Sequence, residues 1–136
     1  MGKLFAILFT ITLVACNVSG PTFNPPIQPG TYAGTFTIVF SVGTDSAYTR
    51  ESHALFVFSD SGSYTCGGGI FLPGGGRYEV ANDSLYLTDD WMRVAIWDWT
   101  QVLEGPFYYV VEGGKLMMTQ RDSRLNRYRS LELVRQ

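Results

Sequence analysis

The sequence has few of the residues that build most catalytic and metal centres. Its 136 residues include 2 cysteines and 1 histidine, which excludes a multi-histidine metal site. Lysine and arginine number 10 against 12 acidic residues, so no basic excess indicates a nucleic acid as a partner. The acidic residues are dispersed, with no Asp-x-Asp-x-Asp calcium loop, and no Gly-x-Ser-x-Gly nucleophile motif occurs. These absences predict a protein that is not an enzyme and that uses no cofactor and no metal.

The chain also lacks an apolar run long enough to cross a bilayer, which takes about 20 residues. Its N-terminus has instead Lys3 followed by the uncharged residues 4–15, the layout of a secretory signal. This run ends in Leu13-Val14-Ala15-Cys16, which resembles the lipobox of bacterial lipoproteins. The resemblance implies that residues 1–15 are a cleaved signal peptide and that Cys16 becomes the lipidated first residue. The membrane, reached through the lipid on Cys16, is then one partner of the protein.

Two alternatives to this interpretation are an ordinary secretory signal and N-myristoylation of Gly2. The second lacks the Ser or Thr that its motif requires, because Ala6 stands at that position. Asn17 follows the lipobox cysteine, where similar lipoproteins of enteric bacteria carry Asp if they stay in the inner membrane. We therefore expect attachment to the outer membrane of the cell envelope, on its periplasmic face, since no acidic run of the kind that marks surface export follows Cys16.

Residues 16–30 are expected to form a flexible tether. The stretch 17–30 holds four prolines, two glycines and no charge, a composition that excludes a helix or a paired strand. Lys3 is the one charged residue in 1–15, so its removal changes the net charge from −2 to −3. Cys66 is the one cysteine left besides the lipidated Cys16, which excludes an intramolecular disulfide.

From Thr31 onward the hydrophobic pattern has a period of two, which is typical of half-buried strands. In the first strand Tyr32, Phe36 and Ile38 share one face, and threonines dominate the other. Because closure removes exposed strand edges, residues 31–136 are predicted to be all-β, a small antiparallel up-and-down β-barrel of about eight strands. The further strands are expected at 52–59, 63–66, 77–80, 84–88, 93–99, 107–112, 115–120 and 127–134.

Four segments carry a resemblance to a known fold family. The opening Pro29-Gly30-Thr31-Tyr32-Ala33-Gly34-Thr35-Phe36 resembles the first strand of small lipocalin-like domains. The later Gly105-Pro106-Phe107-Tyr108-Tyr109, Gly114-Lys115-Leu116 and Tyr128-Arg129-Ser130-Leu131-Glu132-Leu133 are similar to the closing strands of lipocalin-like lipoproteins of bacterial envelopes. The resemblance covers residues 30–136 and implies a lipocalin-like barrel. Tyr32 stands where true lipocalins have the Trp of a Gly-x-Trp motif.

Seventeen of the 106 residues from Thr31 onward are aromatic, which fits either a filled barrel or one that encloses an apolar ligand. Trp97 and Trp99 share one face of a predicted strand, and Trp91 is nearby, so these three are the candidate ligand-binding residues. The glycine triplets at 67–69 and 74–76 are expected to form a mobile loop, a possible gate over the barrel mouth. The expected core comprises Phe36, Ile38, Phe56, Phe58, Leu85, Leu87, Val94, Ile96, Leu116, Leu131 and Leu133.

Three further sets of polar residues have a functional and a structural interpretation. Arginines around the last turn could hold a phosphate or carboxylate, or they could be a solvated hairpin rim. Dispersed carboxylates could form a catalytic or calcium site, but surface charge is the simpler interpretation. His53 could activate Cys66, although Cys66 is better explained as a small buried hydrophobe. The arginines are Arg121, Arg124, Arg127 and Arg129, and the acids are Asp89, Asp90, Asp98, Glu104 and Glu112.

Together these features predict a lipid-anchored envelope protein that binds without catalysis. Its partner is expected to be either a small apolar ligand inside the barrel or another envelope component. The alternative is a structural or accessory lipoprotein with a solid barrel, acting as a subunit or an inhibitor. The volume of the barrel interior distinguishes an enclosed apolar ligand from an envelope partner or a solid structural barrel, because an apolar ligand requires a cavity.

Overall fold

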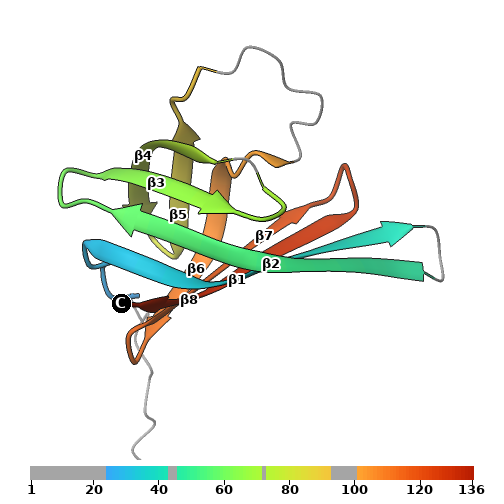
Figure 1. Cartoon of the computed structure of the whole chain (residues 1–136), viewed down its shortest axis with the longest axis horizontal. Helices are drawn as coiled ribbons and strands as arrows, with labels where there is room; N and C mark the ends of the chain where they lie inside the picture. The colour runs from blue at the N-terminus through green and yellow to red at the C-terminus, as the bar shows by residue number, and fades with distance from the viewer. Residues whose placement is uncertain (1–23, 43–45, 72, 93–100) are drawn as a thin grey trace, which may run out of the picture.

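A computed structural model describes residues 24–42, 46–71, 73–92 and 101–136. Eight antiparallel strands follow one another around a closed barrel, and the last pairs with the first (Figure 1). The prediction of an all-β up-and-down barrel is therefore confirmed. The strands are β1 (Gly30–Val42), β2 (Ser46–Phe58), β3 (Ser63–Gly68), β4 (Gly74–Ala81), β5 (Ser84–Asp89), β6 (Gly105–Glu112), β7 (Lys115–Asp122) and β8 (Arg127–Arg135).

Alternation of apolar and polar residues sets the register of every strand, because a shift by one residue would turn the apolar set outward. In β8, for example, Leu131 and Leu133 are buried while Glu132 and Val134 are exposed. The expected core is confirmed wherever the structure describes it: Phe36, Ile38, Phe56, Phe58, Leu85, Leu87, Leu116, Leu131 and Leu133 are all buried. The other two expected core residues, Val94 and Ile96, lie outside the described residues.

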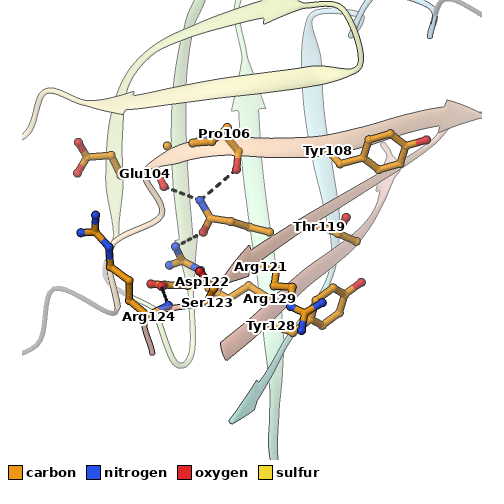
Figure 2. A pocket seen from close by; sticks show the side chains of 12 residues that line it. Glu104, Pro106, Tyr108, Thr119, Arg121, Asp122, Ser123, Arg124, Tyr128 and Arg129 are labelled. Atoms are coloured by element: carbon orange, nitrogen blue, oxygen red, sulfur yellow. Dashed lines mark hydrogen bonds between the residues drawn. The ribbon is translucent and has the colours of Figure 1, made fainter. Parts of the chain in front are cut away.

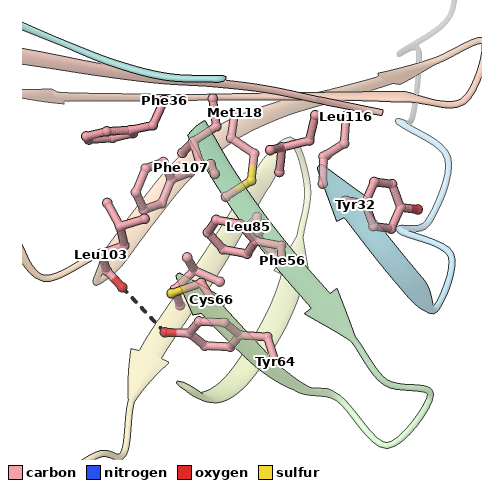
Figure 3. Close-up of a cluster of buried hydrophobic side chains, with 14 of the residues drawn as sticks. Tyr32, Phe36, Phe56, Tyr64, Cys66, Leu85, Leu103, Phe107, Leu116 and Met118 are labelled. Atoms are coloured by element: carbon pink, nitrogen blue, oxygen red, sulfur yellow. Dashed lines mark hydrogen bonds between the residues drawn. The ribbon is translucent and has the colours of Figure 1, made fainter. Parts of the chain in front are cut away.

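Aromatic side chains fill the part of the barrel interior that the structure describes (Figure 3). The ring of Phe56 stacks on Phe58 and Tyr64 at centroid distances of 5.7 and 6.2 Å. The rings of Phe36 and Phe71 pack edge to face, with their centroids 5.1 Å apart. A space of about 40 Å³ remains beside Phe36, Ile38 and Phe71, far below the volume of ordinary ligand cavities, about 300–1,000 Å³.

Residues 24–29, the described part of the predicted tether, are extended but pack against one end of the barrel. Ile27 is buried in the core cluster. The side-chain amide of Asn24 donates to the Tyr109 carbonyl oxygen at 2.7 Å, and Arg135 donates to the side-chain oxygen of Gln28 at 2.7 Å and to the Pro29 carbonyl at 2.8 Å. We call residues 24–29 the strap. The strap therefore begins the folded unit before the first strand.

Five of the six glycines in the two triplets belong to strands, and Gly69 directly follows β3, so the prediction that both triplets form a mobile loop is wrong. Gly67 and Gly68 end β3, whereas residues 74–76 begin β4 and pair with β3. A Cβ on Gly76 would lie 2.0 Å from the Thr88 carbonyl oxygen, and one on Gly68 would lie 2.2 Å from the Phe71 ring. These glycines allow neighbouring strands and a core ring to approach closely, which is a common reason for glycine within a sheet.

The barrel closes without a strand between β5 and β6. Leu85 pairs with Phe107, and Leu87 pairs with Gly105, so β5 and β6 are direct neighbours. The predicted strand at 93–99 falls on residues outside the described ones.

Candidate functional site

The candidate ligand-binding tryptophans do not meet in a site that the structure describes. Cys16, Trp97 and Trp99 lie outside the described residues. Trp91 is 51% exposed, and its indole nitrogen would be 2.7 Å from a Cβ on Gly75. Gly75 pairs with the exposed Thr65, so this indole covers the outer surface of the sheet.

The candidate pair His53 and Cys66 is separated by the barrel wall. Cys66 is buried and faces the interior opposite Phe56, whereas His53 lies on the outer face of β2 and is exposed. A strand places alternate residues on opposite faces, so His53 cannot serve as the base for the Cys66 thiol. Within the described part of the chain, no group of three or more His, Cys, Asp or Glu side chains is positioned to hold a metal ion.

A groove opens where β6 and β7 stop pairing. Their ladder ends at Tyr108 and Thr119, although β7 continues to Asp122. The groove has a volume of about 770 Å³ and is open to solvent. We call it the arginine groove, because it is lined by Arg121, Arg124 and Arg129 together with Glu104, Gly105, Pro106, Tyr108, Thr119, Gln120, Asp122, Ser123 and Tyr128 (Figure 2).

Gln120 bridges the separated strands and forms the floor of the arginine groove. Its side-chain nitrogen donates to the carbonyl oxygens of Glu104 at 2.9 Å and Pro106 at 3.1 Å. Its side-chain oxygen accepts a hydrogen bond from the guanidinium of Arg129. One amide thus replaces the missing ladder bonds, satisfying carbonyl groups that would otherwise need water.

Arg129 is a buried cation beneath this floor, with 5% of its surface exposed. Its Nη1 donates to the Val102 carbonyl at 2.8 Å, and the guanidinium carbon lies 5.8 Å from the centre of the Phe107 ring. Burial, and secondly the charge of Arg127, lowers the pKa of Arg129 to about 10, so the side chain stays protonated at neutral pH. The interpretation of the arginines as a solvated rim is wrong for Arg127 and Arg129, because their β8 positions alternate with exposed residues and face inward.

Asp122 organises the turn between β7 and β8. Its carboxylate accepts hydrogen bonds from the backbone N–H groups of Arg124 at 3.0 Å and Leu125 at 3.3 Å, and from the side chain of Arg127 at 3.2 Å. Partial desolvation raises the pKa of Asp122, but these N–H groups and the positive charge of Arg127 and Arg129 outweigh it. The net result is a pKa below the ordinary value for aspartate.

Arg121 and Arg124 are exposed on the rim of the arginine groove. Nothing in the described part of the chain forms a hydrogen bond or ion pair with either guanidinium. Tyr108 and Tyr128, which are 54% and 42% exposed, stand on the outer face near Arg121. The lining carries three arginines against Glu104 and Asp122, so the groove is positive in a chain whose net charge is −2.

The sequence indicated the four arginines as candidates but not which of them are buried and which are exposed. The alternation along β8 was a usable signal, since Arg127 and Arg129 keep the phase of Leu131 and Leu133. Gln120 was not identified, because its role arises from the point at which two strands separate. A period-two pattern carries no information about that point.

Comparison with protein-family models, with curated proteins and with solved structures finds no match. Among the described residues, no helix is long and apolar enough to cross a membrane.

Proposed function

We propose that this chain is a lipid-anchored protein of a bacterial cell envelope that binds an envelope component on its outer surface, without catalysis. The barrel is a rigid support in this proposal, and the arginine groove is the binding site. The lipid on Cys16 supplies the attachment, and the lipocalin-like resemblance of residues 30–136 concerns the scaffold alone.

The filled interior is the observation that carries this proposal. Ligand cavities usually measure about 300–1,000 Å³. The described interior retains about 40 Å³ beside Phe36 and Phe71, whereas the arginine groove on the outside offers about 770 Å³. The space suitable for a ligand therefore lies outside the barrel, which supports an external partner over an enclosed apolar molecule.

The position of the strap supports an orientation. The strap contacts Arg135 at the end of β8, while the arginine groove involves Arg129 near its beginning. Six residues of a strand span about 20 Å. A chain anchored at Cys16 enters the domain through the strap, which contacts Arg135 at one end and Tyr109, beside the groove residue Tyr108, at the other. The rim arginines at the β7–β8 turn lie at the opposite end of β8 from Arg135, which supports their presentation away from that contact.

Cys16→Ser tests the anchor. We expect the wild-type protein to incorporate labelled fatty acid and to sediment with membranes, and we expect the variant to do neither and to keep its signal peptide. The thiol is the group that takes up the lipid, so a hydroxyl in its place removes the attachment point. Cys66→Ser is the matched control, because that cysteine is buried in the barrel. Fatty-acid labelling that persists in Cys16→Ser would contradict the proposed anchor.

A titration with apolar probes tests the site of binding. Fatty acids added to residues 17–136 are expected to give no saturable change in tryptophan emission, because the described interior has no room for an acyl chain. Trp91→Phe serves as the control, since it removes the indole that lies on the outer surface. A saturable change that persists in Trp91→Phe would place an apolar ligand near Trp97 or Trp99 and contradict external binding.

A further inference from the structure

The four arginines near the β7–β8 turn have two different kinds of surroundings. Arg127 and Arg129 are buried and form hydrogen bonds that hold Asp122, Gln120 and the Val102 carbonyl in place. Arg121 and Arg124 are exposed, and their guanidinium groups are bound to nothing else in the described part of the chain. The buried pair therefore supports the groove from beneath, Arg129 through Gln120 and Arg127 through Asp122, and the exposed pair is available for a ligand.

The fold positions the exposed pair over the groove by different means. Arg121 lies on the outer face of β7 directly opposite Tyr128 of β8. Arg124 lies in the turn, where Asp122 accepts its backbone N–H at 3.0 Å. Figure 2 shows Arg124 on one side of Asp122 and Arg121 on the other, beside Tyr128. Two guanidinium groups thus flank one opening of about 770 Å³.

Electrostatics favour an anion at this opening. The Asp122 carboxylate already accepts three hydrogen bonds, one of them from Arg127, so it is poorly placed to neutralise the rim. Arg129 adds a positive charge beneath the floor, shielded from bulk water by burial. Charges in such surroundings act more strongly on a neighbouring ion than charges in water do. Guanidinium groups also match the geometry of carboxylate and phosphate by bidentate hydrogen bonding.

We infer that the arginine groove binds an oxyanion, a phosphate or a carboxylate carried by an extended ligand, with Arg121 and Arg124 as the contacting residues. The inference rests on the proposed function, in which this groove is the external binding site. Tyr108 and Tyr128 supply exposed ring faces and hydroxyl groups beside the anion site. Rigid amphipathic rings of this kind are favoured at binding surfaces. The volume suits a ligand larger than a single phosphate ion.

The position of Arg121 and Arg124 favours an anion on a component other than the lipids that hold the anchor. Arg129, beneath these two residues, lies about 20 Å along β8 from the strap's contact with Arg135, whereas the strap's other end, Asn24, bonds Tyr109 beside the groove residue Tyr108. Surface potential decays over a Debye length of about 8 Å at physiological ionic strength, so the anchoring headgroups act weakly at that distance. We therefore expect the phosphate or carboxylate to belong to a soluble molecule or to an envelope component that faces the groove.

Calorimetric titration of the full lipoprotein in nonionic detergent tests the inference. The probes are inositol hexakisphosphate for phosphate, trigalacturonate for carboxylate and maltotriose as an uncharged control. We expect saturable binding of at least one anionic probe and none of maltotriose. No binding of either anion, or equal binding of maltotriose, would overturn the assignment.

Variants then identify the contacting residues. Arg121→Gln and Arg124→Gln are each expected to weaken the anionic probe about tenfold, the size of one lost charge-assisted contact, with an unchanged melting temperature. Lys115→Gln is the matched control, because it removes one exposed positive charge at the opposite end of β7. Equal weakening by Lys115→Gln would show non-specific charge attraction, and full affinity in an Arg121→Gln, Arg124→Gln double variant would remove both residues from the site.

Reconstitution into vesicles distinguishes a failure of the anion site from a failure of the lipid anchor. The lipoprotein is placed in phosphatidylcholine vesicles with or without phosphatidylglycerol, and the affinity for the anionic probe is compared at one salt concentration. Equal affinity supports a groove that faces away from the membrane, whereas a marked loss with phosphatidylglycerol would reassign the oxyanion to the lipid headgroup. A protein that fails to float with vesicles yet binds the probe in detergent contradicts the anchor alone. A protein that floats but binds no probe contradicts the anion site alone.

Discussion

Phe56→Ala is expected to lower the free energy of unfolding by about 3–5 kcal/mol, as measured by urea denaturation. The ring is fully buried and lies within 6.3 Å, centroid to centroid, of Phe58, Tyr64 and Phe71. Removing it costs the transfer free energy of the ring and leaves a cavity that closed strands cannot collapse around. Small domains have a total stability of about 5–15 kcal/mol, so this one side chain accounts for a large share.

The neighbouring Val57 is the matched control for this experiment. It lies on the outer face of β2 and is 40% exposed. Val57→Ala should change the unfolding free energy by about 0.5 kcal/mol or less, as is usual for surface positions. If the two variants lose similar stability, the interior is not filled in the way that supports external binding.

Gly34→Ala is expected to destabilise the barrel by about 3 kcal/mol or more, the upper part of the range for overpacking. A Cβ at this position would lie 1.8 Å from the carbonyl oxygen of Glu132 and 2.9 Å from the Cα of Leu133. Both atoms belong to the backbone of β8, which cannot rotate away as a side chain could. The strain falls on the β1–β8 pairing, the contact that closes the barrel.

Gly67→Ala provides the control for the same chemical change. A Cβ there would meet nothing within 4 Å, although Gly67 also lies within a strand. Thermal unfolding of this variant should stay close to wild type, while Gly34→Ala should melt well below it. A Gly34→Ala protein with wild-type stability would show that β1 and β8 do not pack in this register.

Much of the barrel could be predicted from its sequence, because each strand has its own period-two pattern. The face shared by Tyr32, Phe36 and Ile38 was recognisable in this way, and the structure buries all three. Glycines in β3 and β4 were misassigned, because glycine clusters are typical of turns and a pattern does not show what a Cβ would strike. Close strand approach is a property of the assembled barrel.

The candidate site was predictable in residue type and not in arrangement. Arginine spacing around the last turn indicated an anion site or a solvated rim, and the fold produces a buried pair and an exposed pair. Gln120 became important because β6 and β7 part at Tyr108 and Thr119. Where two strands part depends on the tilt and stagger of the whole barrel, which lies beyond any single segment of sequence.

The strap and the β1–β8 ladder also set the order in which the protein can mature. Both join the first part of the domain to its last strand: Pro29 meets Arg135, and Tyr32 pairs with the same residue. Contacts between such distant positions form late in folding, because the loop that joins them must first be closed. A chain synthesised from its N-terminus therefore cannot complete its barrel until β8 is available. Until then, the aromatic rings of the earlier strands remain exposed to solvent and to proteases.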